Sequence, residues 1–190
     1  MFLRTLGATI FVLMITSSSS ALANDCCGDH GKDKADKGAA AKREATPTMA
    51  QYFKIREALA SDKTAGVNDA AKSLHMALKD QAAKLKKTKS LAAAIKATKA
   101  FVKDSAVKEI ARVRKAFGEL TKALVAVSQS PLSKDIIGQV VIFKCSMAKP
   151  YGLWFQQDET IGNPYYGSAM LRCGAVHKRV GAKKAPAAKG

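Results

Sequence analysis

The chain has 190 residues, of which 47% are hydrophobic and 6% aromatic, and its formal net charge is +17. A chain of this length predicts one domain with appendages, and its hydrophobic content is enough for a real core. The few aromatic residues indicate an alanine- and leucine-rich helical core. The excess of Lys and Arg favours partners with anionic surfaces.

Residues 1–23 have the layout of a secretory signal peptide. Arg4 precedes the apolar run 6–15, and Ala21-Leu22-Ala23 forms a small-residue cleavage site. The apolar run is too short to span a membrane. We therefore expect a mature chain without a transmembrane segment, located in the periplasm or secreted. There, a basic protein is expected to meet an anionic envelope surface rather than nucleic acid.

Residues 24–47 are predicted to form a flexible arm because they contain few large apolar residues. The arm carries Cys26, Cys27 and His30 within five positions. Two thiolates and an imidazole at this spacing can chelate a soft metal ion, and the alternative is an arm whose thiols cross-link or stay reduced. Adjacent cysteines disfavour a disulfide with each other on geometric grounds.

Residues 48–176 are predicted to form the folded domain, mainly α: an antiparallel bundle of about four helices with a small C-terminal β-hairpin and a short terminal helix. The longest apolar stripe begins at Val107, with Asp104 as the expected cap. It recurs at spacings of three and four through Ile110, Val113, Phe117, Leu120, Leu124 and Val127. This stripe predicts a core helix that ends before Pro131.

Two strands, 139–147 and 153–157, are predicted to form the hairpin and to lie on the helices through Trp154 or Phe155. A short helix is expected from Asn163, which can cap it, to Gly174, which can end it. The basic tail 177–190 is predicted to be disordered.

Four sulfur-containing side chains lie in these predicted elements. Strand alternation places Cys145 and Met147 on one face, and helical periodicity places Met170 and Cys173 on one face. If the two faces meet, the four sulfurs converge into a site suited to Cu(I) or another soft metal ion. A Cys145–Cys173 disulfide and two plain buried thiols are the alternatives.

The same region carries a family resemblance through four pieces: Cys145-Ser-Met147, Trp154-Phe-Gln156, Asn163-Pro-Tyr-Tyr-Gly167 and Met170-Leu-Arg-Cys173-Gly174. In this order they resemble a bacterial domain of unknown function found in small exported proteins. The same domain occurs at the C-terminus of periplasmic adaptor subunits of heavy-metal efflux pumps. Lys144 stands where the family often has His, so one possible metal ligand is missing.

The resemblance implies an exported protein that binds or handles a soft metal ion in the cell envelope, with metal-efflux or other envelope proteins as partners. The competing hypothesis is a disulfide-stapled interaction module that docks on another envelope component through its basic surface. The sequence contains no Ser/His/Asp arrangement, paired carboxylates or phosphate-binding glycine loop, so nothing specific supports an enzyme.

Overall fold

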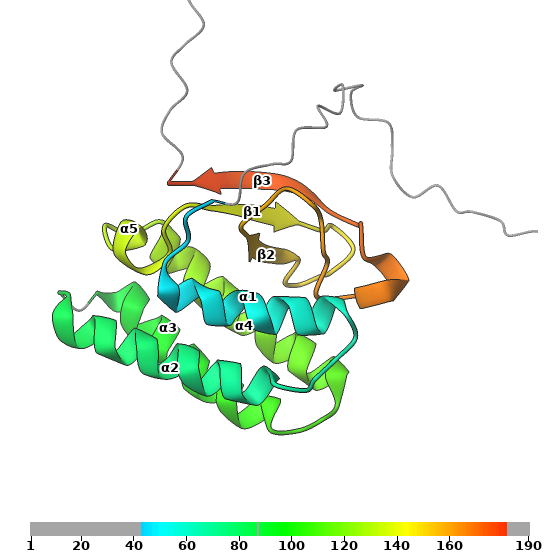
Figure 1. Cartoon of the computed structure of the whole chain (residues 1–190), viewed down its shortest axis with the longest axis horizontal. Coiled ribbons are helices and arrows are strands. Elements are labelled where there is room, and N and C mark those ends of the chain that lie inside the picture. The colour runs from blue at the N-terminus through cyan, green and yellow to red at the C-terminus, as the bar shows by residue number, and fades with distance from the viewer. Residues whose placement is uncertain (1–42, 87, 182–190) are drawn as a thin grey trace, which may run out of the picture. The chain divides into compact units, whose positions relative to one another are not determined.

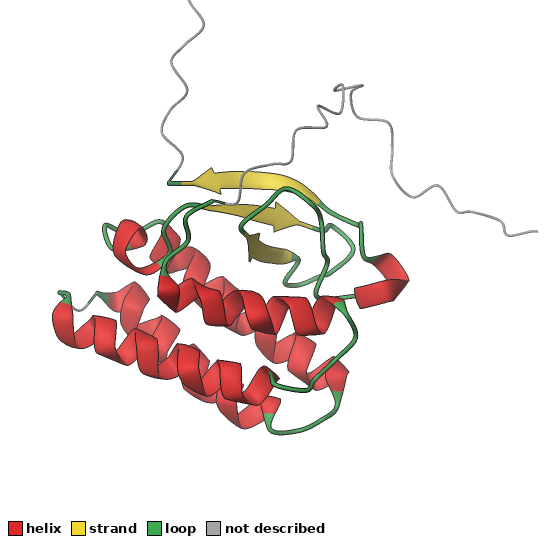
Figure 2. Cartoon of the chain, in the orientation of Figure 1, coloured by secondary structure: helices red, strands yellow, loops and turns green. Residues whose placement is uncertain are grey.

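The structure is a computed structural model that describes residues 43–86 and 88–181. Figure 2 shows helices and one small sheet in this part of the chain. The helices are α1 (Pro47–Ala60), α2 (Val67–Lys84), α3 (Lys89–Ser105), α4 (Ile110–Ser128), α5 (Ser133–Ile136) and the 3-10 helix η1 (Gly167–Met170). The strands are β1 (Val140–Lys144), β2 (Leu153–Gln156) and β3 (Ala175–Val180). The predicted signal peptide and most of the predicted arm lie outside the described residues.

These elements form layers that Figure 1 shows edge-on: the sheet, then α1 with α4, then α2 with α3. Helices α1 and α4 contact strand β2, and α2 and α3 contact each other and the inner helices. The predicted fold class is therefore confirmed: four long helices and a small antiparallel sheet.

Local signals explain where the helices begin. The Thr46 side chain accepts a hydrogen bond from the Met49 amide (3.4 Å), and Pro47 occupies the first helical position, where it sacrifices no hydrogen bond. The Thr88 hydroxyl caps α3 in the same way through the Leu91 amide (3.2 Å). Within the described ranges, none of the helices is both long and apolar enough to cross a bilayer.

The expected start of the longest helix is wrong by three residues. Helix α3 continues through Asp104, and α4 begins at Ile110. Val107 lies in the connection with 36% of its surface exposed, and Asp104 pairs with Arg112 at 2.7 Å instead of capping α4. The stripe from Val113 onward is buried as predicted.

The sheet has the order β2-β1-β3, with both pairs antiparallel. The β1–β2 pair is the predicted hairpin, with Phe143 opposite Trp154 and Ile142 opposite Phe155. Strand β3 shows that the predicted disorder is wrong for residues 177–180, and residues 182–190 of the predicted tail lie outside the described part of the chain. The sequence pattern does not predict this strand, because all of its residues except Val180 are exposed and show no alternation between a buried and an exposed face.

The N-terminal boundary also lies earlier than expected. The Arg43 amide donates to the Gln157 carbonyl (3.1 Å), and Ala45 forms a bridge with Gly138. Residues 43–47, assigned above to the flexible arm, therefore belong to the folded domain because their backbone pairs with it.

Aromatic rings join the layers in the core. Phe117 of α4 stacks on Tyr52 of α1 with ring centroids 5.1 Å apart, and it also contacts Phe101 and Tyr165. Tyr52 meets Phe155 of β2 edge-on at 5.5 Å. All of these residues except Tyr165 are almost fully buried, so the hairpin is anchored on the helices as predicted.

Candidate functional site

The sulfur atoms of Cys145 and Cys173 lie 2.9 Å apart, although the two residues are 28 positions apart in the chain. Cys145 is 2% exposed, and Cys173 is half-buried and packs against the hydrophobic core. We call the segments 145–148 and 170–173, which contain both cysteines, the sulfur corner. The structure thus brings together the two cysteines that the sequence singled out in the folded domain.

Cys145 lies just after β1, where the chain turns back toward β2. Its amide donates to the Gly152 carbonyl (2.8 Å), and its carbonyl accepts from the Ala148 amide (3.4 Å). Gly152 has a φ of +66°, and a side chain there would begin 2.6 Å from the Cys145 carbonyl oxygen. Only glycine closes this turn without moving the cysteine.

Cys173 is held by Asn163, which is fully buried. The Asn163 side-chain amide donates to the Cys173 carbonyl (2.9 Å), and its oxygen accepts from the Tyr165 amide (2.9 Å). The expected helix from Asn163 to Gly174 is therefore wrong: the asparagine forms a turn and ties it to Cys173, and only the 3-10 helix η1 follows.

The two tyrosines after Pro164 fasten the same loop to the hairpin. The Tyr165 hydroxyl donates to the Leu153 carbonyl (2.5 Å), and the Tyr166 hydroxyl donates to the Met147 carbonyl (2.8 Å). Burial raises the pKa of Tyr165 well above its ordinary value, so the hydroxyl keeps the proton that it donates. These bonds press the loop that carries Cys173 against the turn that carries Cys145.

Arg114 of α4 fixes the other side of the loop. Its guanidinium donates to the carbonyls of Leu59 (2.8 Å) and Pro164 (2.9 Å) and pairs with Asp62 at 2.6 Å. A side chain at Gly167, where φ is +56°, would overlap both Asp62 and Arg114. The glycine of the Asn-Pro-Tyr-Tyr-Gly piece therefore makes room for this ion pair.

Asp62 also holds the loop directly, because its carboxylate accepts a hydrogen bond from the Ser168 amide (2.8 Å). The bonds from Ser168 and the adjacent Arg114 guanidinium lower the pKa of Asp62 well below its ordinary value. Local sequence patterns do not predict this ion pair, because Asp62 lies in the turn after α1, 52 positions before Arg114.

The methionines do not lie as expected. Strand β1 ends at Lys144, so Cys145 and Met147 share no strand face, and Met147 is 51% exposed. Met170 is the last residue of η1, and Cys173 follows in the turn, so these two share no helix face. All four sulfur-containing residues nevertheless fall within the two segments of the sulfur corner.

Sulfur atoms are the only metal-binding donors that the described residues bring together in the sulfur corner, and sulfur donors suit a soft metal ion. Among the described residues there is no group of three or more His, Cys, Asp or Glu side chains that could hold a metal ion. A site here would use the two thiolates with Met147 or Met170, and thioethers suit Cu(I). The predicted ligands Cys26, Cys27 and His30 lie outside the described residues.

Sulfur spacing sets a further condition. A tetrahedral metal with bonds of about 2.3 Å holds two sulfurs about 3.8 Å apart. The observed 2.9 Å means that metal binding requires the sulfurs to separate by about 1 Å. Cys173 is the residue to move, because it is only half-buried whereas Cys145 is enclosed.

One comparison with known proteins gave a match. Residues 48–138 match the model of a family described as a protein of unknown function (DUF3347). The comparison with curated proteins gave no match, and neither did the comparison with solved structures. The matched region spans α1 to α5 and ends before β1, so it does not include the sulfur corner. Over its helices, this chain is similar to a domain of unknown function.

Proposed function

We propose that the protein is an exported binding protein for a soft metal ion such as Cu(I), held by the thiolates of Cys145 and Cys173. The observation that supports this is the approach of two cysteine sulfurs to 2.9 Å in a corner whose two segments each also contain a methionine. Thiolate and thioether donors select Cu(I) over harder ions. Such a protein would hand its metal to, or receive it from, a metal-efflux or other envelope protein.

The loop bonds described above give the site a defined geometry. Asn163, Tyr165 and Tyr166 hold the backbone on both sides of the cysteines through hydrogen bonds of 2.5–2.9 Å. The side chain of Cys173 can then rotate to admit a metal without unfolding the loop. Protons compete with the metal for the thiolates, so affinity should fall as the pH falls.

A titration with Cu(I) tests this proposal. Cu(I) is added anaerobically to reduced protein in the presence of a competing chelator. The parent protein carries Cys26→Ser and Cys27→Ser, so that the thiols of the arm cannot bind the metal. We expect one Cu(I) per chain, loss of high-affinity binding in Cys145→Ser, and weaker binding in Met147→Leu, which keeps nearly the same volume. Met76→Leu is the matched control, because Met76 is 54% exposed on α2, far from the cysteines in the chain. Equal affinity of Cys145→Ser and the parent would refute the site.

The short sulfur separation favours a second candidate, a disulfide-stapled interaction module. At 2.9 Å the sulfurs are closer than a shared metal would hold them. Oxidation would remove one proton and one electron from each thiol and pass them to an oxidising disulfide partner, which is reduced to two thiols. By loop entropy, the resulting bond would stabilise the fold by about 3–4 kcal/mol.

The two candidates use the same sulfurs and give opposite results. The staple predicts that protein from its own compartment is 2 Da lighter per chain than the reduced form. It also predicts that reduction lowers the melting temperature, and that Met147→Leu changes nothing. Metal bound to protein purified without oxidant supports the first candidate, and a disulfide with no metal supports the second.

A further inference from the structure

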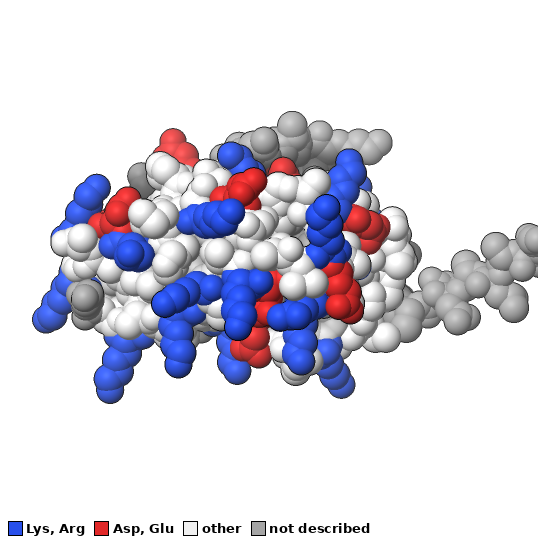
Figure 3. Space-filling view, turned by 90° about the horizontal axis from the view of Figure 1, so that it is seen from below, with Lys and Arg blue, Asp and Glu red and all other residues white. Residues whose placement is uncertain are grey.

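The outer helical layer, formed by α2 and α3, carries a concentrated positive charge. Residues 67–108 contain ten lysines and three aspartates, with no glutamate or arginine. Figure 3, which views the molecule from below, shows many Lys and Arg side chains on this face, with fewer Asp and Glu side chains lying among them. We call the outward side of α2 and α3 the basic face.

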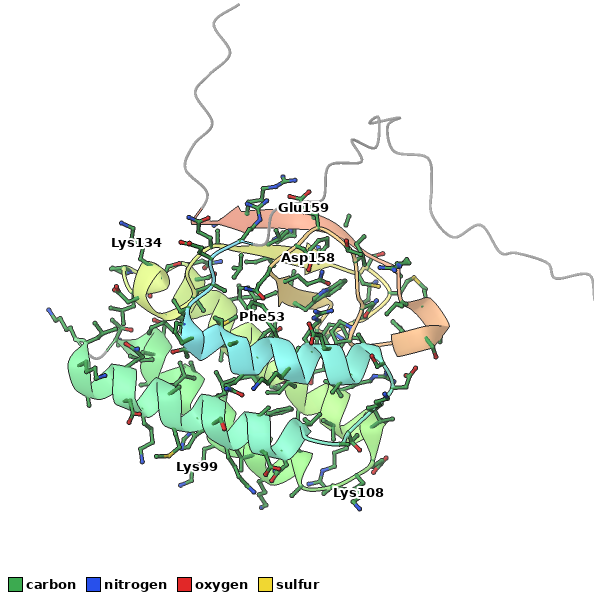
Figure 4. The ribbon with its side chains drawn as sticks, in the orientation of Figure 1. Phe53, Lys99, Lys108, Lys134, Asp158 and Glu159 are labelled. Atoms are coloured by element: carbon green, nitrogen blue, oxygen red, sulfur yellow. The ribbon has the colours of Figure 1, made fainter. Side chains whose placement is uncertain are left out.

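Helical spacing explains how the basic face forms. On α2, Lys72, Met76 and Lys79 are three or four residues apart and lie opposite the buried stripe. On α3, the same spacing places Lys96, Lys99 and Lys103 on the exposed side. Figure 4 shows Lys99 and Lys108 pointing away from the fold at this edge.

The charge on this face is largely left without acidic neighbours. Among the described residues, the one ion pair made by a lysine of α2 or α3 joins Lys72 to Asp69 at 3.4 Å, and both side chains are more than half exposed. Asp80 is exposed on the same helix, and Asp104 is engaged by Arg112. Lys79, Lys96, Lys99 and Lys103 are therefore available to a partner.

The basic face also contains an exposed apolar side chain. Met76 is 54% exposed and lies between Lys72 and Lys79 on α2. More than half of the Met76 surface therefore faces water among lysines. At a bilayer it would insert below the headgroups, while the lysine stems extend their ammonium groups to the phosphates.

From these observations we propose that the basic face docks the protein on an anionic lipid bilayer. Lysines on two helices that lie side by side spread over a surface rather than along a line, which fits a planar array of negative headgroups. A linear polyanion would use the charges but would gain nothing from Met76. The sulfur corner lies on the sheet side of the fold (Figure 1), so docking through α2 and α3 would leave it accessible.

The test compares two variants with the same loss of charge. The first is Lys96→Gln/Lys99→Gln/Lys103→Gln on the basic face. The second is Lys134→Gln/Lys144→Gln/Lys178→Gln, whose residues are all exposed on α5, β1 and β3; Figure 4 shows Lys134 on the sheet side of the bundle. Binding of the full chain is measured by co-sedimentation with phosphatidylcholine vesicles containing or lacking 30% phosphatidylglycerol.

We expect binding only to the anionic vesicles, and release as salt rises because screening shortens the range of the attraction. Each lysine near an anionic surface contributes about fivefold to partitioning, so the first variant should bind about a hundredfold more weakly. The second variant should stay within a few-fold of the parent. Equal losses in both variants would overturn the assignment of this face, since net charge alone would then explain binding.

Met76→Ser separates a bilayer from a soluble polyanion. We expect this variant to lose several-fold in vesicle binding while its retention on heparin is unchanged. If it binds vesicles like the parent, and the parent binds heparin as tightly as vesicles, the bilayer is the wrong partner. Melting curves for each variant check that the fold is intact, as is expected for exposed positions.

Discussion

Replacing Phe117 by alanine should show how strongly the fold depends on one ring. Phe117 is fully buried in α4 and contacts Tyr52 of α1, Phe101 of α3 and Tyr165 of the loop that carries Cys173. Truncating a buried phenylalanine costs about 3–5 kcal/mol, because apolar burial is lost and a cavity remains. Loss of three aromatic contacts places this site in the upper half of that range.

The expected loss of folding stability is large for a domain of this length. A loss of about 4 kcal/mol compares with a typical total stability of about 5–15 kcal/mol. It should lower the melting temperature by about 10–15 °C. Phe117→Leu keeps an apolar side chain and should lose less than half as much.

Urea unfolding followed by circular dichroism measures the effect. The midpoint should fall while the slope of free energy against urea stays the same, since the surface exposed on unfolding is unchanged. Lys115→Ala, an exposed position on the same helix, serves as the control and should change stability by less than about 0.5 kcal/mol. If the two alanine variants lose the same stability, Phe117 does not have the central role that its contacts indicate.

Three further predictions concern single contacts. Hydrogen bonds from Ser168 and Arg114 lower the native pKa of Asp62. The charged Asp62 carboxylate therefore contributes fully to the folding stability above about pH 4, and this contribution is lost as the pH falls toward the native pKa. The melting temperatures of the parent and Asp62→Asn should thus differ most at pH 5–7 and converge below pH 4; a constant difference would contradict the ion pair. Gly118→Ala would overlap the Tyr151 ring, so it should destabilise by about 1–3 kcal/mol, and Tyr151→Ala in the same chain should restore most of the loss in a denaturant melt. Finally, a thiol-specific label should reach Cys173 in the reduced protein much faster than Cys145, because only Cys173 is half-exposed; equal rates, read by mass spectrometry, would show that the corner opens.

The helices were predictable because their apolar stripes repeat over many residues. Val113, Phe117 and Leu124 are buried along one side of α4, as spacing alone indicated. The ends of the helices were harder to predict. Asp104 has a side chain that could cap α4, but it forms an ion pair with Arg112 instead. The sequence around Asp104 does not show which of these two partners its carboxylate binds.

The site was predictable only in part. Both cysteines were identified, but their approach depends on bonds between distant residues, such as Asn163 with Cys173 and Tyr166 with Met147. Local periodicity has no information on such bonds, and it wrongly extended the strand past Lys144. Strand β3 was missed for a related reason: its place depends on backbone pairing with β1, which leaves no pattern in its side chains.

Glu159 links the two ends of the described chain. Its carboxylate pairs with Arg43 at 2.7 Å and with Arg179 at 3.0 Å, residues near the first and last described positions. Ala45 forms a bridge with Gly138, and Gly181 lies so close to Gly138 that an added Cβ would be 2.9 Å from the Gly138 carbonyl oxygen. The first and last described residues therefore lie near each other. A domain with adjoining ends can be inserted into a surface loop of a host protein without stretching that host. The fold is therefore suited to genetic transplantation as a cassette, and to circular permutation with a short linker joining residues 43 and 181.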